Sequence, residues 1–171
     1  YGTQGVPSSA NNPGYRIWGV PSWVDKDGNF WLFGGLGMTG IVGDLWKFDP
    51  NPTSPTYNEW TWMKGTITDN DPGYYGTKGI TNTANTPAGR HETAASWTDD
   101  NGQLWLFGGT VFDGPINDLW RYNPADNNWT WMKGDMTYWA LPVYGARRMP
   151  DNNSDPGARF IYSKWKDQDG P

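Results

Sequence analysis

The chain contains no cysteine, a single histidine and no long apolar segment. The absence of cysteine excludes a disulfide framework and a thiolate metal site. No apolar run approaches the ~18 residues of a transmembrane helix, which predicts that nothing in the chain spans a membrane. The sequence begins at Tyr1 without a signal peptide, and we therefore expect a mature or trimmed product.

Positive charge is also scarce. The 13 Lys and Arg residues are outnumbered by 18 Asp and Glu, which gives a formal net charge of −5. No basic run is longer than Arg147-Arg148. Because proteins bind nucleic acid chiefly by neutralising its phosphates, the composition predicts no nucleic-acid partner.

Aromatic residues and turn-formers are abundant instead. The chain has 13 Trp, 9 Tyr and 6 Phe among 23 Gly and 14 Pro, yet its mean hydropathy is −0.78. Gly and Pro punctuate tight turns, and aromatic side chains suit the half-buried surface of a pleated sheet. This composition predicts an all-β protein of short strands with an aromatic core.

Internal repeats define the organisation of the chain. NFWLFGG at 29–35 returns as QLWLFGG at 103–109, an offset of 74 residues that also relates Asp44-Leu45-Trp46 to Asp118-Leu119-Trp120. EWTWMKG at 59–65 returns as NWTWMKG at 128–134, an offset of 69. The difference falls in the segment after Pro50, which we interpret as a surface loop that tolerates changes in length.

The flanking segments occur three times. A Pro–Gly–Arg motif opens each unit, and a Tyr-Gly pair marks each connecting loop; the copies are 13–16, 87–90 and 156–159, and Tyr1-Gly2, Tyr75-Gly76 and Tyr144-Gly145. Matches to the third unit continue through 163–165 and 167–170 and then stop. We therefore expect the chain to end within a repeat.

Each unit is predicted to form four short strands. In the second unit we expect them at 90–97, 104–107, 118–122 and 129–133, with a hairpin turn at 99–102 and a strand break at Gly108-Gly109. Four antiparallel strands per unit are typical of a propeller blade. The predicted segments are an inter-blade loop (1–13), blade A (14–65), an insertion (66–86), blade B (87–134), a second insertion (135–155) and the truncated start of blade C (156–171).

The motifs LWLFGG, NDLWRYNP and NWTWMKG of the second unit resemble the kelch repeat, with paired glycines after the second strand and a Trp in the fourth. With PGAR and SWTDDNG they are most similar to a bacterial, galactose-oxidase-like kelch subclass. The resemblance implies a kelch-type β-propeller, here incomplete with about two and a half four-stranded antiparallel blades, where an intact ring has about four to eight.

The repeated glycines and tryptophans are interpreted as structural. In strands three and four, alternate aromatic residues share one face of the sheet, which suits packing between blades. The structural positions are Gly34, Gly35, Trp46, Trp60, Trp62, Gly108, Gly109, Trp120, Trp129 and Trp131. The recurring Arg16, Arg90 and Arg159 are expected to bond carboxylates or carbonyls at blade edges.

No catalytic site is predicted, and no cofactor or metal. A copper-radical oxidase like galactose oxidase needs a Cys–Tyr cross-link and two histidines, whereas this chain has His91 alone, which we expect to be structural or solvent-facing. Residues 98–105 resemble the Asp box of sialidases, but no arginine triad or tyrosine nucleophile can be assigned, so we interpret the segment as a β-turn. The acidic turns at 69–71 and 151–155 lack the spacing of a calcium loop and are expected to be solvated.

Binding is expected at one end of the propeller. Antiparallel order places the loops between strands two and three (36–43 and 110–117) at the same end as the two long insertions. Variable loops on a rigid scaffold are common binding sites, and Trp139 has no aromatic counterpart in the first insertion. The candidate ligand-binding residues are Tyr74, Tyr75, Lys78, Tyr138, Trp139, Tyr144 and Arg147.

These observations favour a non-catalytic propeller that is secreted or on the cell surface and acts in adhesion, protein interaction or assembly. The expected partners are other protein chains or surface glycans, further copies of the chain or the remaining blades. A lectin-like carbohydrate-binding propeller is one alternative. A fragment of an oxidase or glycan-active enzyme, with catalytic residues outside this chain, is another.

Overall fold

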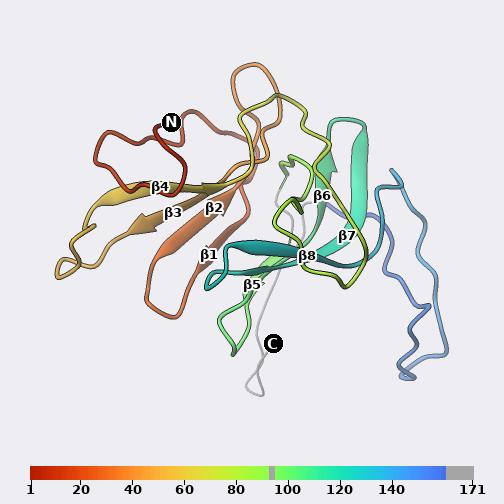
Figure 1. Cartoon of the computed structure of the whole chain (residues 1–171). Helices are drawn as coiled ribbons and strands as arrows, with labels where there is room; N and C mark the ends of the chain where they lie inside the picture. Colours follow the sequence, from red (N-terminus) through yellow and green to blue (C-terminus); the bar gives the residue numbers. More distant parts are fainter. Residues whose placement is uncertain (93–94, 161–171) are drawn as a thin grey trace.

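The fold consists of two four-stranded antiparallel sheets (Figure 1). The computed structural model describes residues 1–92 and 95–160, and these contain eight strands and no helix. Blade A comprises β1 (Ser22–Val24), β2 (Phe30–Phe33), β3 (Leu45–Asp49) and β4 (Glu59–Lys64). Blade B comprises β5 (Ala95–Thr98), β6 (Leu104–Val111), β7 (Gly114–Asn123) and β8 (Asn128–Lys133). In both blades the strands are paired in sequence order, so the prediction of an all-β fold with four-stranded blades is confirmed.

The turn between the first two strands of each blade is built around an aspartate. Asp25 accepts hydrogen bonds from the backbone N–H groups of Asp27 and Asn29 and from the Trp31 indole. Asp99 makes the same bonds in blade B, to residues 101, 103 and 105. The predicted hairpin at 99–102 is therefore present, and the aspartate that organises it occurs in both repeats.

The strands of blade B are longer than predicted. β6 continues through Gly108 and Gly109 to Val111, and β7 begins at Gly114. The predicted strand break at the two glycines is wrong, because a register shift between Phe107 and Gly109 absorbs them and pairing resumes at Gly109 and Ile116. The expected loop at 110–117 is thus a tight hairpin. β5 is described from Ala95, whereas we expect a strand from residue 90, and the repeat matches at 163–165 and 167–170 lie outside the described residues.

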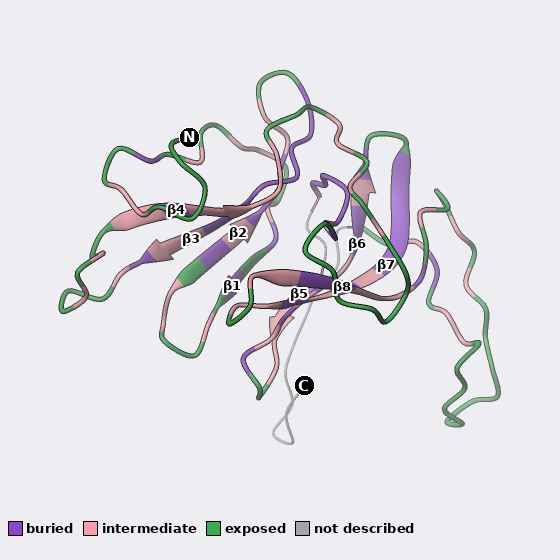
Figure 2. Cartoon of the chain, viewed as in Figure 1, coloured by how far each residue is buried: buried purple, intermediate pink, exposed green. Residues whose placement is uncertain are grey.

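The core lies between the two blades. It combines Trp23, Trp31, Phe33 and Leu45 of blade A with Leu104, Leu106, Trp120, Tyr122 and Trp129 of blade B. Across the interface the Trp31 ring lies 5.4 Å from Tyr122, and Phe33 lies 5.7 Å from Trp129, both edge to face. Figure 2 shows buried residues on the strands and on stretches of the connecting segments, and exposed residues mainly in the outer turns and insertions. Aromatic packing between the blades therefore holds the two sheets together.

The repeated aromatic residues pair as the alternation predicts. Trp46 is opposite Trp62 and Phe48 opposite Trp60, and in blade B Trp120 is opposite Trp131. Trp46, Trp120 and Trp129 are fully buried, whereas Trp60, Trp62 and Trp131 are half-buried.

Gly34 adopts a φ of +67°, and a Cβ there would lie 2.7 Å from the carbonyl oxygen of Arg90. This glycine lets the connection between the blades pass directly over β2.

Candidate functional site

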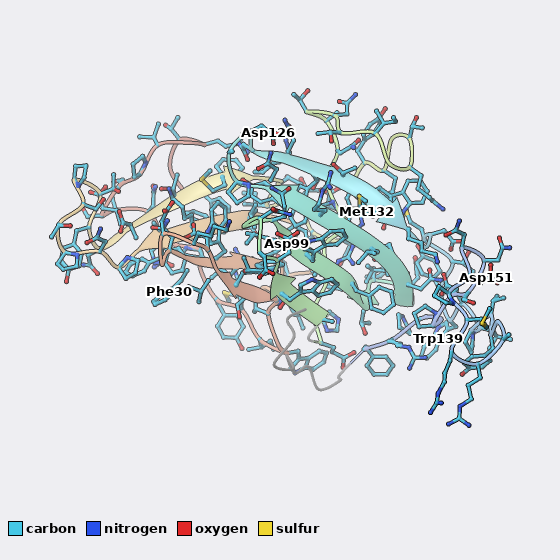
Figure 3. The ribbon with its side chains drawn as sticks, turned by 90° about the horizontal axis from the view of Figure 1, so that it is seen from below. Phe30, Asp99, Asp126, Met132, Trp139 and Asp151 are labelled. Atoms are coloured by element: carbon cyan, nitrogen blue, oxygen red, sulfur yellow. The ribbon has the colours of Figure 1, made fainter. Side chains whose placement is uncertain are left out.

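The insertions after the fourth strands and the connections between the second and third strands meet at one end of the blades. Asn70, in the connection after β4, donates its backbone N–H to the Ile41 carbonyl, and its side-chain oxygen accepts a hydrogen bond from the Ile41 backbone N–H. In the next unit the backbone N–H of Trp139 donates to the Pro115 carbonyl. Figure 3 shows Trp139 and Asp151 together at one end of the molecule, far from Phe30. The insertions and the connections between second and third strands therefore form one surface.

A buried polar cluster fixes the first insertion to blade B. The Arg90 guanidinium donates to both carboxylate oxygens of Asp118, at 2.6 and 2.8 Å, and neither side chain has exposed surface. Tyr75 O–H and the Trp120 indole N–H donate to the same carboxylate, at 2.5 and 2.7 Å. Arg90 also donates to the Gly108 carbonyl. We call this arrangement of Tyr, Arg, Asp and Trp the blade lock, because it ties a connecting segment to the third strand of the blade that follows.

The same lock occurs in blade A. Arg16 bonds the Asp44 carboxylate and the Gly34 carbonyl, Trp46 donates its indole N–H to Asp44 at 2.6 Å, and Tyr1 O–H donates to Asp44. The expected bonding of the repeated arginines is thus observed for Arg16 and Arg90. Their recurrence supports a structural role.

The protonation states of the lock argue against proton transfer. Burial raises the pKa of Tyr75 well above its usual value, and the Asp118 carboxylate raises it further. Burial alone would lower the pKa of Arg90, but Asp118 holds that pKa above its usual value. The phenol therefore stays protonated and the guanidinium charged, so the cluster acts as a fixed ion pair.

Two of the candidate ligand-binding residues pack against blade B. The Tyr75 ring lies 4.8 Å from Trp120 and 5.1 Å from Trp131, both edge to face. The Lys78 ammonium lies over the Trp131 ring, 4.4 Å from its centroid. Tyr144 and Arg147, the residues at the same positions in the second insertion, are exposed. The structure thus gives Tyr75 and Lys78 structural contacts and leaves Tyr144 and Arg147 at the surface.

Trp139 is the most unusual surface residue. Its side chain is 64% exposed, and its backbone has a φ of +58°, a conformation that a bulky residue seldom adopts. The offset of 69 pairs it with Asn70, whose φ is +57° and whose type tolerates this conformation. The Trp139 ring lies edge to face against Phe160, 6.3 Å away. An exposed indole is therefore held at a backbone position better suited to asparagine.

The other candidates lie on the same surface. Tyr138 precedes Trp139 and lies beside Asp113 at the tip of the β6–β7 hairpin, and burial followed by a hydrogen bond to that carboxylate raises its pKa. Phe112, also at this tip, is exposed. Tyr74 is exposed while its backbone pairs with Thr86. Tyr138 and Trp139 are thus accompanied by Phe112 and Phe160, which the sequence analysis did not select.

A second exposed indole, Trp18, was also missed. It is 60% exposed at a φ of +61°, and its ring lies 5.4 Å from that of His91. The offset of 74 pairs Trp18 with Glu92, also at positive φ, whose N–H donates to the Trp18 carbonyl. Trp18 has no tryptophan counterpart in the second unit, and this departure from the repeat is the sequence feature that could have indicated an exposed aromatic residue.

His91 is buried, which agrees with the structural interpretation. Its backbone pairs with Thr110, and its Nδ1 atom has no hydrogen-bond partner among the described residues. Burial lowers its pKa from the usual 6.5, an effect that Glu92 partly opposes. The unfolded chain therefore binds the proton more readily than the folded protein as the medium is acidified.

We expect the free energy of unfolding to fall as the pH drops through 6.5, and His91→Ile to reduce this loss. Isoleucine is the matched choice because Ile17 occupies the equivalent position in the first unit. Urea denaturation of both proteins at about pH 8, 6.5 and 5 measures the difference. Identical pH profiles would show that His91 titrates alike in the folded and unfolded states.

Within residues 1–92 and 95–160, no group of three or more metal-ligating side chains lies close enough to hold a metal ion. The same residues include no helix long and apolar enough to cross a membrane. In the acidic turns at 69–71 and 151–155, which we expect to be solvated, aspartates form hydrogen bonds within their own loops. Asp71 and Asp151 each accept a hydrogen bond from the backbone N–H of the residue two positions further along the chain.

The stacked four-stranded sheets, each joined to the preceding connection by a blade lock, define a protein of the β-propeller class. Comparison with protein-family models finds the Kelch motif at residues 100–130, which supports a kelch-repeat protein. The two sheets fit an incomplete kelch-type propeller. A comparison with curated proteins gives no match. Kelch repeats are in general non-catalytic modules that mediate protein interactions.

Proposed function

We propose that this chain is a non-catalytic interaction module, secreted or on the cell surface, that binds a protein partner in adhesion or assembly. The proposed contact surface is centred on Trp139 and includes Tyr138, Phe112 and Phe160. Location outside the cell is inferred from the acidic composition, rich in Asn, Thr and Gly. A kelch motif and a rigid scaffold of stacked sheets support the interaction role.

The conformation of Trp139 carries the proposal. A non-glycine residue in a sparsely populated backbone region costs about 1–3 kcal/mol, and exposure of the indole forgoes most of the stabilisation that burial would give. Asn70 shows that the fold itself does not require an aromatic side chain at this position. A strained and exposed tryptophan that the fold does not need is best explained by contact with a partner.

The contacts of Trp139 also fix its orientation. Its backbone N–H donates a hydrogen bond to the Pro115 carbonyl at 2.9 Å. Its indole Nε1 lies 2.5 Å from the position that a Cβ on Gly114 would occupy. The ring thus rests on the first residue of β7, against Phe160. A side chain held in one orientation loses little conformational entropy on binding.

Trp139→Asn is expected to raise the free energy of unfolding by about 1 kcal/mol, through relief of backbone strain, and to weaken partner binding at least about tenfold. Urea denaturation measures the first effect. For the second, the wild type and variant are immobilised and exposed to a cell-surface protein extract, and captured proteins are compared by quantitative mass spectrometry.

Tyr57→Ala is the matched control, because Tyr57 is an exposed aromatic residue in the β3–β4 connection, at the opposite end of blade A. It should leave capture unchanged. If every protein captured by the wild type is captured equally by Trp139→Asn, the proposed surface is wrong.

Glycan binding is the second candidate, because an exposed indole is also a platform on which a pyranose ring packs. A glycan array probed with the wild type and Trp139→Asn separates the two. Signals lost only in the variant would favour a carbohydrate ligand, whereas an array without signals, together with Trp139-dependent protein capture, would favour the protein partner.

A further inference from the structure

Two consecutive units carry opposite chemistry at one place in the repeat, just before the first strand of each blade. A backbone bridge pairs two residues there, and a third residue, at positive φ, follows the first of them. The apolar set of the first unit and the polar set of the second are Ile17, Leu36 and Trp18, and His91, Thr110 and Glu92. Because the backbone is alike in the two units, the fold itself does not require this change of side chains.

The two sets meet at the junction between the blades. The Glu92 backbone N–H donates to the Trp18 carbonyl, and the Trp18 ring lies 5.4 Å from the His91 ring at an angle of 56°. The Glu92 carboxylate accepts a hydrogen bond from the Thr110 hydroxyl at 2.7 Å. An indole from the first unit and a carboxylate from the second therefore leave the backbone at neighbouring points.

The Glu92 carboxylate has no basic partner in the described part of the chain. The ion pairs within residues 1–92 and 95–160 are those of the two blade locks, which involve the arginines at 16 and 90. His91 is buried next to Glu92, and burial lowers its pKa from the usual 6.5, an effect that Glu92 partly opposes. At neutral pH the imidazole is therefore uncharged and does not neutralise the carboxylate.

Trp18 combines exposure with an unfavourable backbone conformation. It is 60% exposed at a φ of +61°, which costs free energy in a bulky residue. Glu92 adopts the same conformation in the second unit, at a φ of +56°, so the position does not require an indole. The His91 ring supports the indole, and its buried Nδ1 atom has no hydrogen-bond partner among the described residues. This arrangement holds an exposed indole beside an unpaired carboxylate.

An exposed indole beside a carboxylate has the chemistry that recognises an organic cation. The ring attracts the cation through its quadrupole, and the carboxylate attracts it by charge. A guanidinium group favours a bidentate pair with both oxygens of a carboxylate, whereas Oε2 of Glu92 already accepts the Thr110 hydroxyl. A compact ammonium group on an alkyl chain has no such requirement and also packs its methylene or methyl groups on the ring.

We propose that Trp18 and Glu92 form a binding site for an alkylammonium group at the junction between the two blades. The ammonium group lies on the exposed part of the Trp18 ring and beside the Glu92 carboxylate. His91 supports the ring, and Thr110 fixes the carboxylate. The group is carried by a lysine side chain of a partner protein or by a free quaternary ammonium compound. This site is additional to the surface centred on Trp139.

Choline and its uncharged isostere, in which carbon replaces the nitrogen, test whether the site recognises positive charge. Saturation-transfer difference NMR of the ligand methyl signals measures binding to the whole chain at constant ionic strength. We expect choline binding to saturate in the millimolar range. The uncharged isostere should bind at least about fivefold more weakly, because it keeps the shape and loses the attraction to the ring and the carboxylate. Equal binding of the two ligands would overturn the proposal.

Glu92→Gln and Trp18→Asn are the decisive variants. Glutamine keeps an acceptor for the Thr110 hydroxyl without the charge, and asparagine removes the indole while tolerating positive φ. Each substitution should weaken choline binding about two- to fivefold, and the double variant should abolish it. Urea denaturation should show an unchanged unfolding midpoint for Glu92→Gln, so that lost binding is not lost folding. Tyr57→Ala, which removes an exposed aromatic residue elsewhere, should bind choline as the wild type does.

Two short peptides distinguish the sources of the ammonium group. One contains a single lysine and the other a single trimethyllysine, and both are measured against the wild type and Glu92→Gln. Tighter binding of a peptide than of choline assigns the site to a lysine of a partner protein, and tighter binding of choline assigns it to a free compound. Choline binding that survives in Trp18→Asn/Glu92→Gln, or that Trp139→Asn abolishes instead, would show that the site is wrongly placed.

Discussion

Asp118→Ala is expected to lower the free energy of unfolding by about 3–5 kcal/mol, because it leaves the buried Arg90 guanidinium without a counter-ion. Tyr75 and Trp120 lose their acceptor in the same step. Each buried donor left unsatisfied adds to the cost. Urea denaturation followed by tryptophan fluorescence measures the change.

Asp44→Ala is the matched control in blade A. Its partners are less buried than those of Asp118, since the Arg16 side chain keeps some exposed surface and Tyr1 is partly exposed, so both can turn toward water when the carboxylate is lost. We therefore expect a smaller loss, about 1–3 kcal/mol. Equal losses at the two positions would mean that burial by a neighbouring blade does not strengthen the lock.

A second control removes both charges of the pair in blade B. Arg90→Met/Asp118→Leu should recover part of the stability lost in Asp118→Ala, because no buried charge is then left unpaired. If the double variant is less stable than the single one by a further 3 kcal/mol or so, the bonds of Arg90 to carbonyl groups matter more than its charge.

The sequence predicted the blades because the same strand motifs recur at constant offsets, so hydrophobic alternation and turns reinforce one another. The sequence does not predict the continuation of β6 through Gly108-Gly109, because paired glycines indicate the end of a strand. The signal for the longer hairpin was Asp113-Gly114 between apolar residues, a typical hairpin turn. The first unit has Gly37, Gly40 and Gly43 in the equivalent connection and forms no such hairpin.

The site was predictable only in part. Topology correctly brings the insertions and the connections between second and third strands to one end, and Trp139 is selected by its departure from the repeat. The structural contacts of Tyr75 and Lys78 depend on a connecting segment folding back onto the following blade, which repeat spacing alone does not reveal. The backbone conformation of Trp139 was accessible through its alignment with Asn70, since asparagine favours positive φ.

Trp129→Ala is expected to cost about 3–5 kcal/mol, the range for a fully buried aromatic side chain. Trp129 lies 5.7 Å from Phe33 across the blade interface and 5.0 Å from Tyr122 within its own sheet. Its indole N–H has no partner among the described residues, so Trp129→Phe should cost less, because the smaller ring keeps the contacts and removes the unsatisfied donor. Denaturation curves of both variants measure the two values.

Trp60→Ala is the matched comparison, because Trp60 occupies in blade A the repeat position that Trp129 occupies in blade B. Trp60 lies on the outer face of blade A and is half-buried. It should cost roughly 1–2 kcal/mol, in proportion to the smaller area buried. A cost for Trp60→Ala as large as that for Trp129→Ala would mean that packing between blades A and B adds little to the stability that each tryptophan gains within its own sheet. The difference between the two costs therefore measures how much of the stability at this repeat position comes from the contact between the blades.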